Sequence, residues 1–280
     1  MTPPTTLPMT PARRRALAVG GALAAVLIAA GALQLVSLVG WGSRAEERSL
    51  VPPAGPLVVD VGSGDLTLRQ AEGERVRVRT TVHHSLGAPR IEQRRGPDGL
   101  LVLRGSCGGP LSWMNCSADH EVAVPEGVAV EVRASSGEVA ASDLTGLRVE
   151  VSSGDIDVSD VDGSLMLRAT SGDIDVSDVD GSVVLRTSSG GIRADGLDGD
   201  ADARASSGDV TLEFDSAPSR VRAVASSGDV DIRLPGSGGG YRVQTETGSG
   251  DSTVDVVADP GSARLVEAAT SSGDVTVEPR

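Results

Sequence analysis

The stretch VSSGDIDVSDVDGSLMLR occupies residues 151–168, and ATSGDIDVSDVDGSVVLR follows it directly at residues 169–186. The two copies share the run IDVSDVDGS letter for letter. Recurrence at a fixed period of this size is typical of stacked units, none of which can bury its apolar side chains alone. The sequence therefore predicts that each copy lies on the one before it.

S-G-D, S-G-E and S-G-G triplets punctuate this repeat. After a first gap of 73 residues, their spacings are 17, 18, 18, 18, 20, 22 and 23. Glycine permits a positive φ, and neighbouring Ser and Asp side chains can bond the turning backbone. We interpret the triplets as structural corners of the repeat. Their glycines are Gly64, Gly137, Gly154, Gly172, Gly190, Gly208, Gly228, Gly250 and Gly273.

Between the corners, apolar residues recur with a period of two. In one unit they are Ile156, Val158, Val161, Leu165 and Leu167. The pattern predicts two short strands per unit, with S-S-G-D at one corner and V-D-G-S at the other. The glycines and the β-branched residues oppose a helix.

Two all-β architectures fit such units. One is a parallel β-solenoid with coils of about 18 residues, stacked at ~4.8 Å; the other is an antiparallel meander or β-sandwich. The only aromatic residues are Trp41, Trp113, Phe214 and Tyr241, so the core must be aliphatic. A meander would need a second layer to cover its apolar face, and the chain offers none, whereas a coil encloses its own core. We therefore predict the solenoid.

The N-terminal region has the features of a membrane anchor. Arg13, Arg14 and Arg15 precede residues 16–40, which carry no charged side chain. A helix of this length spans a hydrocarbon core of about 30 Å, and the positive-inside rule places residues 1–15 in the cytoplasm. A cleaved signal peptide is the alternative. We expect a single-pass protein of the cell membrane, with its C-terminal domain extracytoplasmic.

Three segments follow the expected transmembrane helix. Residues 41–56 mix charges with prolines and are predicted to be a juxtamembrane linker. Residues 57–133 alternate less regularly and are interpreted as irregular first coils, serving as the cap that the end of a solenoid needs. Residues 134–280 contain the regular repeats.

Charge is unevenly distributed along the chain. Residues 1–133 contain 14 Arg and 12 acidic residues, a charge of +2, whereas residues 134–280 contain 11 Arg and 27 acidic residues, a charge of −16. The total is −14. A surface this acidic repels phosphate backbones, so nucleic acid is not an expected partner.

Stacking would place acidic side chains above one another, with Asp157 over Asp175 and Asp160 over Asp178. Carboxylates ~5 Å apart repel by about 1 kcal/mol in water, and calcium between the coils would relieve this repulsion. Arg193 takes the next place in the Asp157 column, however, and the spacing differs from that of the nine-residue calcium repeat. We expect a solvated acidic face and no cofactor, with calcium as the alternative.

Cys107 and Cys116 are the only cysteines. An extracytoplasmic compartment permits a disulfide, and closing so short a loop would contribute about 2 to 3 kcal/mol in the chain-entropy model. We predict this bridge. The alternatives are two buried thiols or a metal site, which would have only His120 nearby as a further ligand.

The histidines provide few bases for catalysis. His83 and His84 are adjacent in an expected strand, so their side chains point to opposite faces. With His120 they are the only histidines, which leaves little scope for a Ser-His-Asp arrangement. We therefore expect no catalytic residues, no cofactor-binding residues and no metal ligands.

The segment CGGPLSWMNCSADHEVAVPEG at residues 107–127, the serial S-S-G-D corners and the anchor together resemble a bacterial family named "putative adhesins", whose function is unknown. The resemblance covers roughly residues 57–280. It implies a right-handed β-helix-like fold and an extracytoplasmic location.

Three functions are compatible with these features. The first is a non-enzymatic, membrane-anchored module for adhesion or cell-envelope interaction, which contacts an unknown protein or envelope polymer. The second is an envelope sensor or scaffold that partners a membrane regulatory protein. The third is a polysaccharide-processing β-helix enzyme, which rests on analogy of fold alone.

Overall fold

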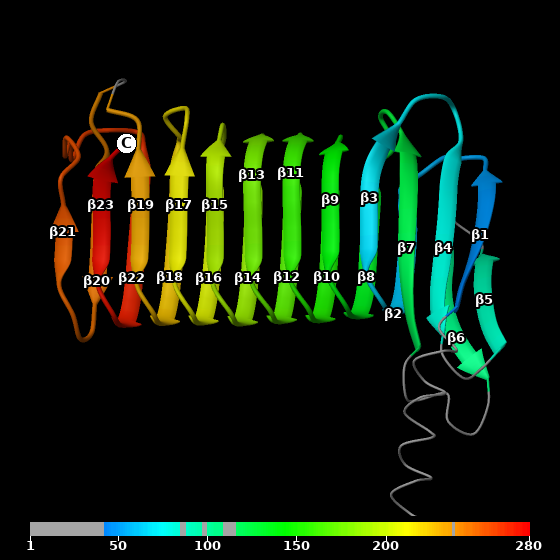
Figure 1. Cartoon of the computed structure of the whole chain (residues 1–280). Helices are drawn as coiled ribbons and strands as arrows, with labels where there is room; N and C mark the ends of the chain where they lie inside the picture. The colour runs from blue at the N-terminus through cyan, green and yellow to red at the C-terminus, as the bar shows by residue number, and fades with distance from the viewer. Residues whose placement is uncertain (1–41, 85–87, 97–99, 109–115, 237–238) are drawn as a thin grey trace, which may run out of the picture.

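Two long β-sheets face each other along the described part of the protein (Figure 1). The computed structural model describes residues 42–84, 88–96, 100–108, 116–236 and 239–280. In spatial order, sheet A contains β1 (Gly42–Leu50), β4 (Val76–His84), β7 (Cys116–Pro125), β3 (Leu66–Ala71), β9 (Val139–Leu144), β11 (Ile156–Asp162), β13 (Ile174–Asp180), β15 (Ile192–Leu197), β17 (Val210–Phe214), β19 (Val230–Leu234), β23 (Val275–Pro279) and β21 (Ser252–Val254). Sheet B contains β20 (Arg242–Thr247), β22 (Leu265–Ser272), β18 (Arg220–Ser227), β16 (Ala201–Ser207), β14 (Val183–Ser189), β12 (Leu165–Ser171), β10 (Leu147–Ser153), β8 (Val130–Ser136), β2 (Leu57–Ser63), β6 (Leu100–Gly108) and β5 (Ala88–Arg95).

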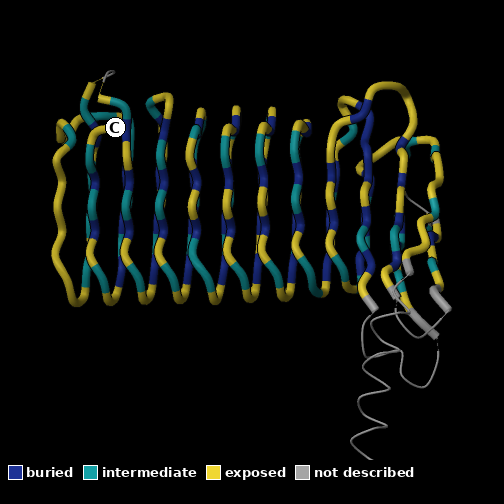
Figure 2. The backbone as a smooth tube through the Cα atoms, viewed as in Figure 1, coloured by how far each residue is buried: buried dark blue, intermediate teal, exposed yellow. Residues whose placement is uncertain are grey.

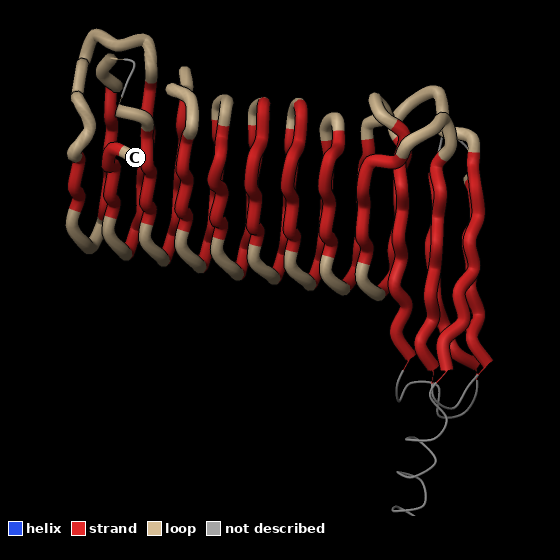
Figure 3. The backbone as a smooth tube through the Cα atoms, turned by 45° about the horizontal axis from the view of Figure 1, so that its top comes forward, coloured by secondary structure: helices blue, strands red, loops and turns tan. Residues whose placement is uncertain are grey.

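The chain alternates between the two sheets, so that one strand of each sheet makes one coil. Figure 3 shows the strands joined by short corners at both edges of the stack. Neighbouring coils pair in parallel and in register, and Ile156 lies opposite Ile174 while Leu165 lies opposite Val183. A repeat of 18 residues therefore places each residue on its counterpart. The predicted all-β solenoid is confirmed at this level, and the antiparallel meander is wrong for the repeats.

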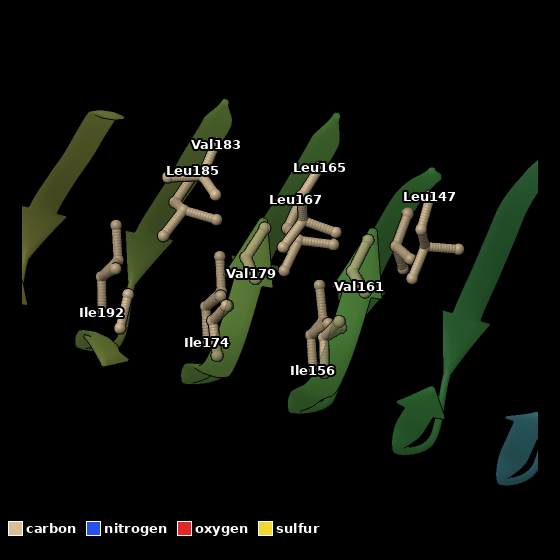
Figure 4. Packing of buried hydrophobic residues seen from close by; sticks show 14 of the residues in the cluster. Leu147, Ile156, Val161, Leu165, Leu167, Ile174, Val179, Val183, Leu185 and Ile192 are labelled. Atoms are coloured by element: carbon tan, nitrogen blue, oxygen red, sulfur yellow. The ribbon is translucent and has the colours of Figure 1, made fainter. Parts of the chain in front are cut away.

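The core is a set of aliphatic columns between the sheets. Ile156, Ile174 and Ile192 follow one another in sheet A and are at most 2% exposed. Leu167 and Leu185 face them from sheet B (Figure 4). Figure 2 shows this buried band continuing through successive coils. Burying one such side chain contributes about 2 kcal/mol, so a column of many small units replaces the aromatic core of an ordinary globule.

A kink in β11 and in β13 explains why the spacing of their inward residues changes from two to three. Asp160 and Asp178 both have a φ of 54°, in the left-handed region. Each therefore inserts one extra residue, as a bulge does, and Val161 and Val179 point inward like Val158 and Val176. Asp tolerates this conformation better than most residues do.

The order of the coils in space differs from their order in the sequence at both ends. The coil β2–β3 lies between β6–β7 and β8–β9, and the coil β22–β23 lies between β18–β19 and β20–β21. Gly64 therefore stacks directly against Gly137 despite the gap of 73 residues, and Gly273 stacks between Gly228 and Gly250.

Antiparallel strands close the N-terminal end. Strand β4 pairs with β1 and β7, and β5 pairs with β6. Side chains also bridge the two outermost strands: Arg48 Nη1 donates to the Gln93 carbonyl at 2.9 Å, and Gln93 Nε2 donates to the Glu46 carbonyl at 3.2 Å. The outermost backbone groups thus gain partners that a bare sheet edge lacks.

Strand β1 lies in residues 41–56, for which the sequence predicts a linker. Its side chains are mostly exposed, so it shows no apolar alternation. It forms because β4 offers a complete row of backbone partners, from Val76 to His84. The expected transmembrane helix, residues 16–40, lies outside the described residues. Among the described residues, no helix is both long enough and apolar enough to cross a membrane.

The corner glycines provide a direct test of the stacking. A Cβ added at Gly172, where φ is 136°, would lie 2.0 Å from the Gly154 carbonyl oxygen. We expect Gly172→Ala to lower the free energy of unfolding by about 3 kcal/mol, as measured by denaturant titration. Gly236→Ala is the matched control, because nothing lies within 4 Å of its added Cβ, and should cost less than about 0.5 kcal/mol. Equal effects of the two substitutions would contradict close stacking.

Candidate functional site

The nine corner glycines named above lie in one column along the edge of the stack. From Gly137 onward, a Cβ added to any of these eight glycines would lie 2.0 to 2.3 Å from a carbonyl oxygen of the neighbouring corner. The backbones are this close because they are hydrogen-bonded: the Gly172 amide donates to the Ser189 carbonyl at 2.9 Å. The column of glycines is thus a structural requirement of the stack.

The corner carboxylates bond the backbone of the neighbouring coil. Asp155 Oδ1 accepts the Asp173 amide at 2.9 Å, and Asp173 Oδ1 accepts the Gly191 amide at 2.7 Å. The same bond recurs farther along the stack, where Asp209 accepts the Asp229 amide at 2.9 Å. These carboxylates are therefore occupied by amides, which explains why S-G-D recurs without implying a ligand.

Charge is segregated between the two outer faces. In four consecutive coils, sheet A and the corners beside it are formed by residues 137–146, 154–164, 172–182 and 190–200. These contain 13 acidic residues and one Arg, a formal charge of −12. The matching sheet B segments, residues 147–153, 165–171, 183–189 and 201–207, contain four Arg and two acidic residues, a charge of +2. The protein therefore has an acidic face and an arginine-bearing face.

A shallow groove of about 350 Å³ runs over the acidic face of sheet A. Small side chains, including Ser159 and Ser177, form part of its lining, and Asp157 and Asp175 lie beside them. Burial and the neighbouring Asp157 carboxylate raise the pKa of Asp175. Arg193 opposes this shift, with its Nε atom 4.0 Å from Asp175 Oδ1. The groove thus offers hydroxyls and carboxylates, the groups that recognise cationic or hydroxyl-rich partners.

The groove contains one of the two carboxylate pairs for which the sequence raises the possibility of calcium, Asp157 and Asp175; Asp160 and Asp178 do not line it. Asp157 pairs with Asp175, and Arg193 follows Asp175 in the same row. Within the ranges that the structure describes, no group of three or more His, Cys, Asp or Glu side chains is placed to hold a metal ion. The expectation of a solvated acidic face without a cofactor, with calcium as the alternative, therefore stays a prediction.

The arginines of sheet B form a row that the sequence analysis missed. Arg168 pairs with Arg186, and Arg186 with Arg204, in successive coils. Acidic residues neutralise part of the row: Arg204 Nε lies 3.0 Å from Asp202, and Glu150 takes the place before Arg168. The sequence contained a signal for this row: in β12, β14 and β16, an Arg directly follows the second inward residue of the strand.

The cysteines lie on separate strands of the N-terminal part. Cys107 is in β6, opposite Pro89 of β5, and Cys116 begins β7, opposite His84 of β4. Their side chains fall outside the described part of the chain, as does the connection at residues 109–115. The disulfide therefore stays a prediction.

The structure separates the histidines. His83 is exposed, and its Nε2 lies 3.0 Å from Asp119. His120 is only 1% exposed, and its Nδ1 bonds the Thr80 hydroxyl at 3.0 Å. Gln93 Nε2 donates to the same hydroxyl at 3.0 Å. Burial lowers the pKa of His120 to about 4, although Asp119 acts in the opposite direction. His120 is thus a neutral structural residue at neutral pH.

Comparison with known proteins identifies the family of the chain. The sequence model of the Toastrack DUF4097 family matches residues 55–278. Among solved structures, a "putative adhesin" from Bacteroides fragilis is 12% identical, covers 85% of this chain and 97% of its own, and has a TM-score of 0.47. A "putative lipid binding protein" from Parabacteroides distasonis is 13% identical, with the same coverages and a TM-score of 0.44. No curated protein matches the chain. At these scores, the neighbours say nothing about what this chain binds.

The buried imidazole predicts acid sensitivity. The pKa of His120 is lower in the folded state, about 4, than its ordinary value of 6.5. Its contribution to stability is therefore complete above pH 6.5 and is lost as the pH falls toward 4, by up to about 3 kcal/mol. We expect His120→Gln to reduce this loss, measured as the free energy of unfolding at several pH values. Equal slopes for His120→Gln and the parent would contradict the prediction.

The stacked carboxylates predict a small gain from neutralisation. Asp157→Asn should lower the pKa of Asp175, because it removes the neighbouring negative charge, and should stabilise the fold by about 0.5 kcal/mol at low salt. NMR titration of Asp175 and thermal unfolding measure the two effects. The gain should disappear in 1 M salt, where the Debye length is about 3 Å. A variant less stable than the parent in calcium would instead show that calcium bridges these carboxylates.

Proposed function

Starting from the fact that the chain belongs to the Toastrack DUF4097 family, we propose that it is a non-enzymatic, membrane-anchored protein of the cell envelope. In this proposal it holds a stiff β-solenoid outside the membrane and contacts an envelope polymer or protein through the solenoid faces. The role is that of an adhesin-like interaction module.

The observation that carries the proposal is the continuous rod with two differently charged faces. Twelve strands in sheet A, about 4.8 Å apart, give a rod roughly 50 Å long. Each coil packs its inward side chains on those of the neighbouring coils. The rod therefore needs no separate domain to cover its core. Such a rod presents the same chemistry repeatedly along its length, which suits an extended partner better than a small substrate.

The proposal includes the location and the anchor. Residues 16–40 form the transmembrane helix, and residues 1–15 remain in the cytoplasm. Strand β1 begins at Gly42, directly after this helix, and lies at one end of sheet A. The rod then leads away from its attachment toward β21 at the opposite end. We take the coils to be right-handed, as parallel crossovers almost always are.

Site-specific photo-crosslinking on intact cells tests this function. A benzophenone amino acid replaces Arg168 on sheet B in one variant and Asp175 on sheet A in another, both at exposed positions of successive coils. We expect one face to yield adducts with an envelope polymer or protein, and the other face serves as its control.

Two outcomes would overturn the proposal. The absence of adducts from both faces would remove the envelope contact. Adducts from either face with a single membrane regulatory protein would establish the sensor or scaffold function instead.

A further inference from the structure

The outer face of sheet B carries three arginines in one row. Arg168 pairs with Arg186, and Arg186 pairs with Arg204, in the neighbouring strands β12, β14 and β16. Arg168 is exposed, and the side chains of Arg186 and Arg204 are 39% and 41% exposed. Neighbouring strands are about 4.8 Å apart, and like charges directly opposite each other destabilise a sheet. An external anion would relieve this repulsion.

Acidic side chains compensate only part of the charge in this row. Arg204 Nη2 donates to Asp202 Oδ2 at 3.0 Å, whereas Arg186 Nη2 lies 3.9 Å from the same carboxylate. Glu150, which precedes Arg168 in the row, is bound instead by an arginine of its own strand at 2.7 Å. Within the part of the chain that the structure describes, the side chain of Arg168 has neither an ion pair nor a hydrogen bond.

A row of hydroxyls runs beside the arginines. Strands β12, β14 and β16, and β10 before them, each have an exposed Ser or Thr on this outer face near the corner. Because the strands are in register, these side chains follow one another along the rod, about 7 Å from the arginine row. Their hydroxyls bond no other group among the described residues. They are Ser152, Thr170, Ser188 and Ser206.

The acidic face of sheet A lies on the far side of the rod. Packed sheets are about 10 Å apart, and the charged ends of the side chains extend farther on either side. Exposed charges separated by more than the Debye length, about 8 Å at physiological salt, are largely screened from each other. An anionic partner on sheet B therefore meets chiefly the charge of that sheet, which is +2 over the four coils counted above.

The two rows specify the chemistry of such a partner. The planar guanidinium binds a carboxylate or a phosphate through two parallel hydrogen bonds. The hydroxyl row adds neutral donors and acceptors, which suit the hydroxyl groups of a sugar ring. Both rows repeat at the spacing of the coils, which is similar to the length of one sugar unit in an extended polysaccharide. An acidic polysaccharide offers carboxylates and hydroxyls at this interval, whereas a polyphosphate offers only anionic oxygens.

We propose that the outer face of sheet B binds an acidic polysaccharide whose sugar units carry carboxylates. Arg168, Arg186 and Arg204 bind the carboxylates, and the Ser/Thr row bonds the sugar hydroxyls. The polymer lies along the rod, across the strands, so that successive units meet successive coils. This inference rests on the proposed envelope contact, and it names the face and the class of polymer.

Removing one arginine from the row tests the site. Polygalacturonate is the probe, because each of its sugar units carries one carboxylate, and biolayer interferometry measures binding of the purified full-length protein to the immobilised polymer. Arg186→Gln should weaken binding about tenfold, through loss of a charge-assisted contact. Arg193→Gln on sheet A is the matched control, because it changes the net charge equally on the opposite face, and should alter the affinity less than about twofold. Equal effects of the two variants would overturn the proposal.

Two further measurements test the chemistry of recognition. Asp202→Asn should tighten binding about threefold, because Asp202 competes with the polymer for Arg186 and Arg204. Fully methyl-esterified polygalacturonate keeps its ring hydroxyls but loses its charge, and should not bind. Binding of the ester, weaker binding by Asp202→Asn, or equally tight binding of polyphosphate overturns the proposal.

The inference and the proposed function fail separately. If purified protein does not bind polygalacturonate, the inference is wrong, whereas adducts on cells still decide the envelope contact. If purified protein binds the polymer as expected but neither face yields adducts on cells, the recognition chemistry stands and the proposed function is wrong.

Discussion

The rest of the structure depends on the close approach of one corner backbone to the next. Coils in a parallel sheet are about 4.8 Å apart, and at the S-G-D corner the amide of one glycine bonds across this distance to the neighbouring coil. No Cβ fits there. The adjacent Asp adds a side-chain bond to the next amide, as Asp155 does to Asp173. The corner therefore sets the spacing between neighbouring coils, and the same spacing applies to every other column of the stack.

The charged faces follow from this common spacing of the coils. Once the coils are in register, any residue type repeated at the same position becomes a row along the rod. Inward positions give rows of Ile, Val and Leu, whereas outward positions give carboxylates on sheet A and arginines on sheet B. A conventional globule would scatter these residues. Here the surface carries the chemical repeat of the sequence, so function is more readily expected from faces and ends than from one enclosed pocket.

The sequence allowed prediction of whatever is local to one repeat. The 18-residue period and the inward positions of Ile156 and Leu165 could be read directly, because alternation and glycine placement depend on neighbouring residues. The insertion of β2–β3 and β22–β23 could not, because a corner such as Gly64 fits several places in the stack equally well. Strand β1 was missed because its exposed residues do not alternate.

The polar groups were only partly predictable. Stacking of Asp157 on Asp175 followed from the period alone. The burial of His120 required knowledge that β4 and β5 meet across the end of the stack, since Thr80 and Gln93 come from those strands. The period of two places His120 on the same face as Ala118 and Val122, but the local sequence of residues 117–125 does not show which groups meet the imidazole.

The inserted coil β22–β23 has a consequence for how the rod comes apart. Linear repeat arrays usually fray from their terminal units, one after another. In this protein residues 265–279 are held between two other coils, with β22 beside β18 and β20, and β23 beside β19 and β21. Peeling that segment away means breaking a ladder on each side of both strands at once. Dismantling of this end must therefore start in the loops around β20 and β21.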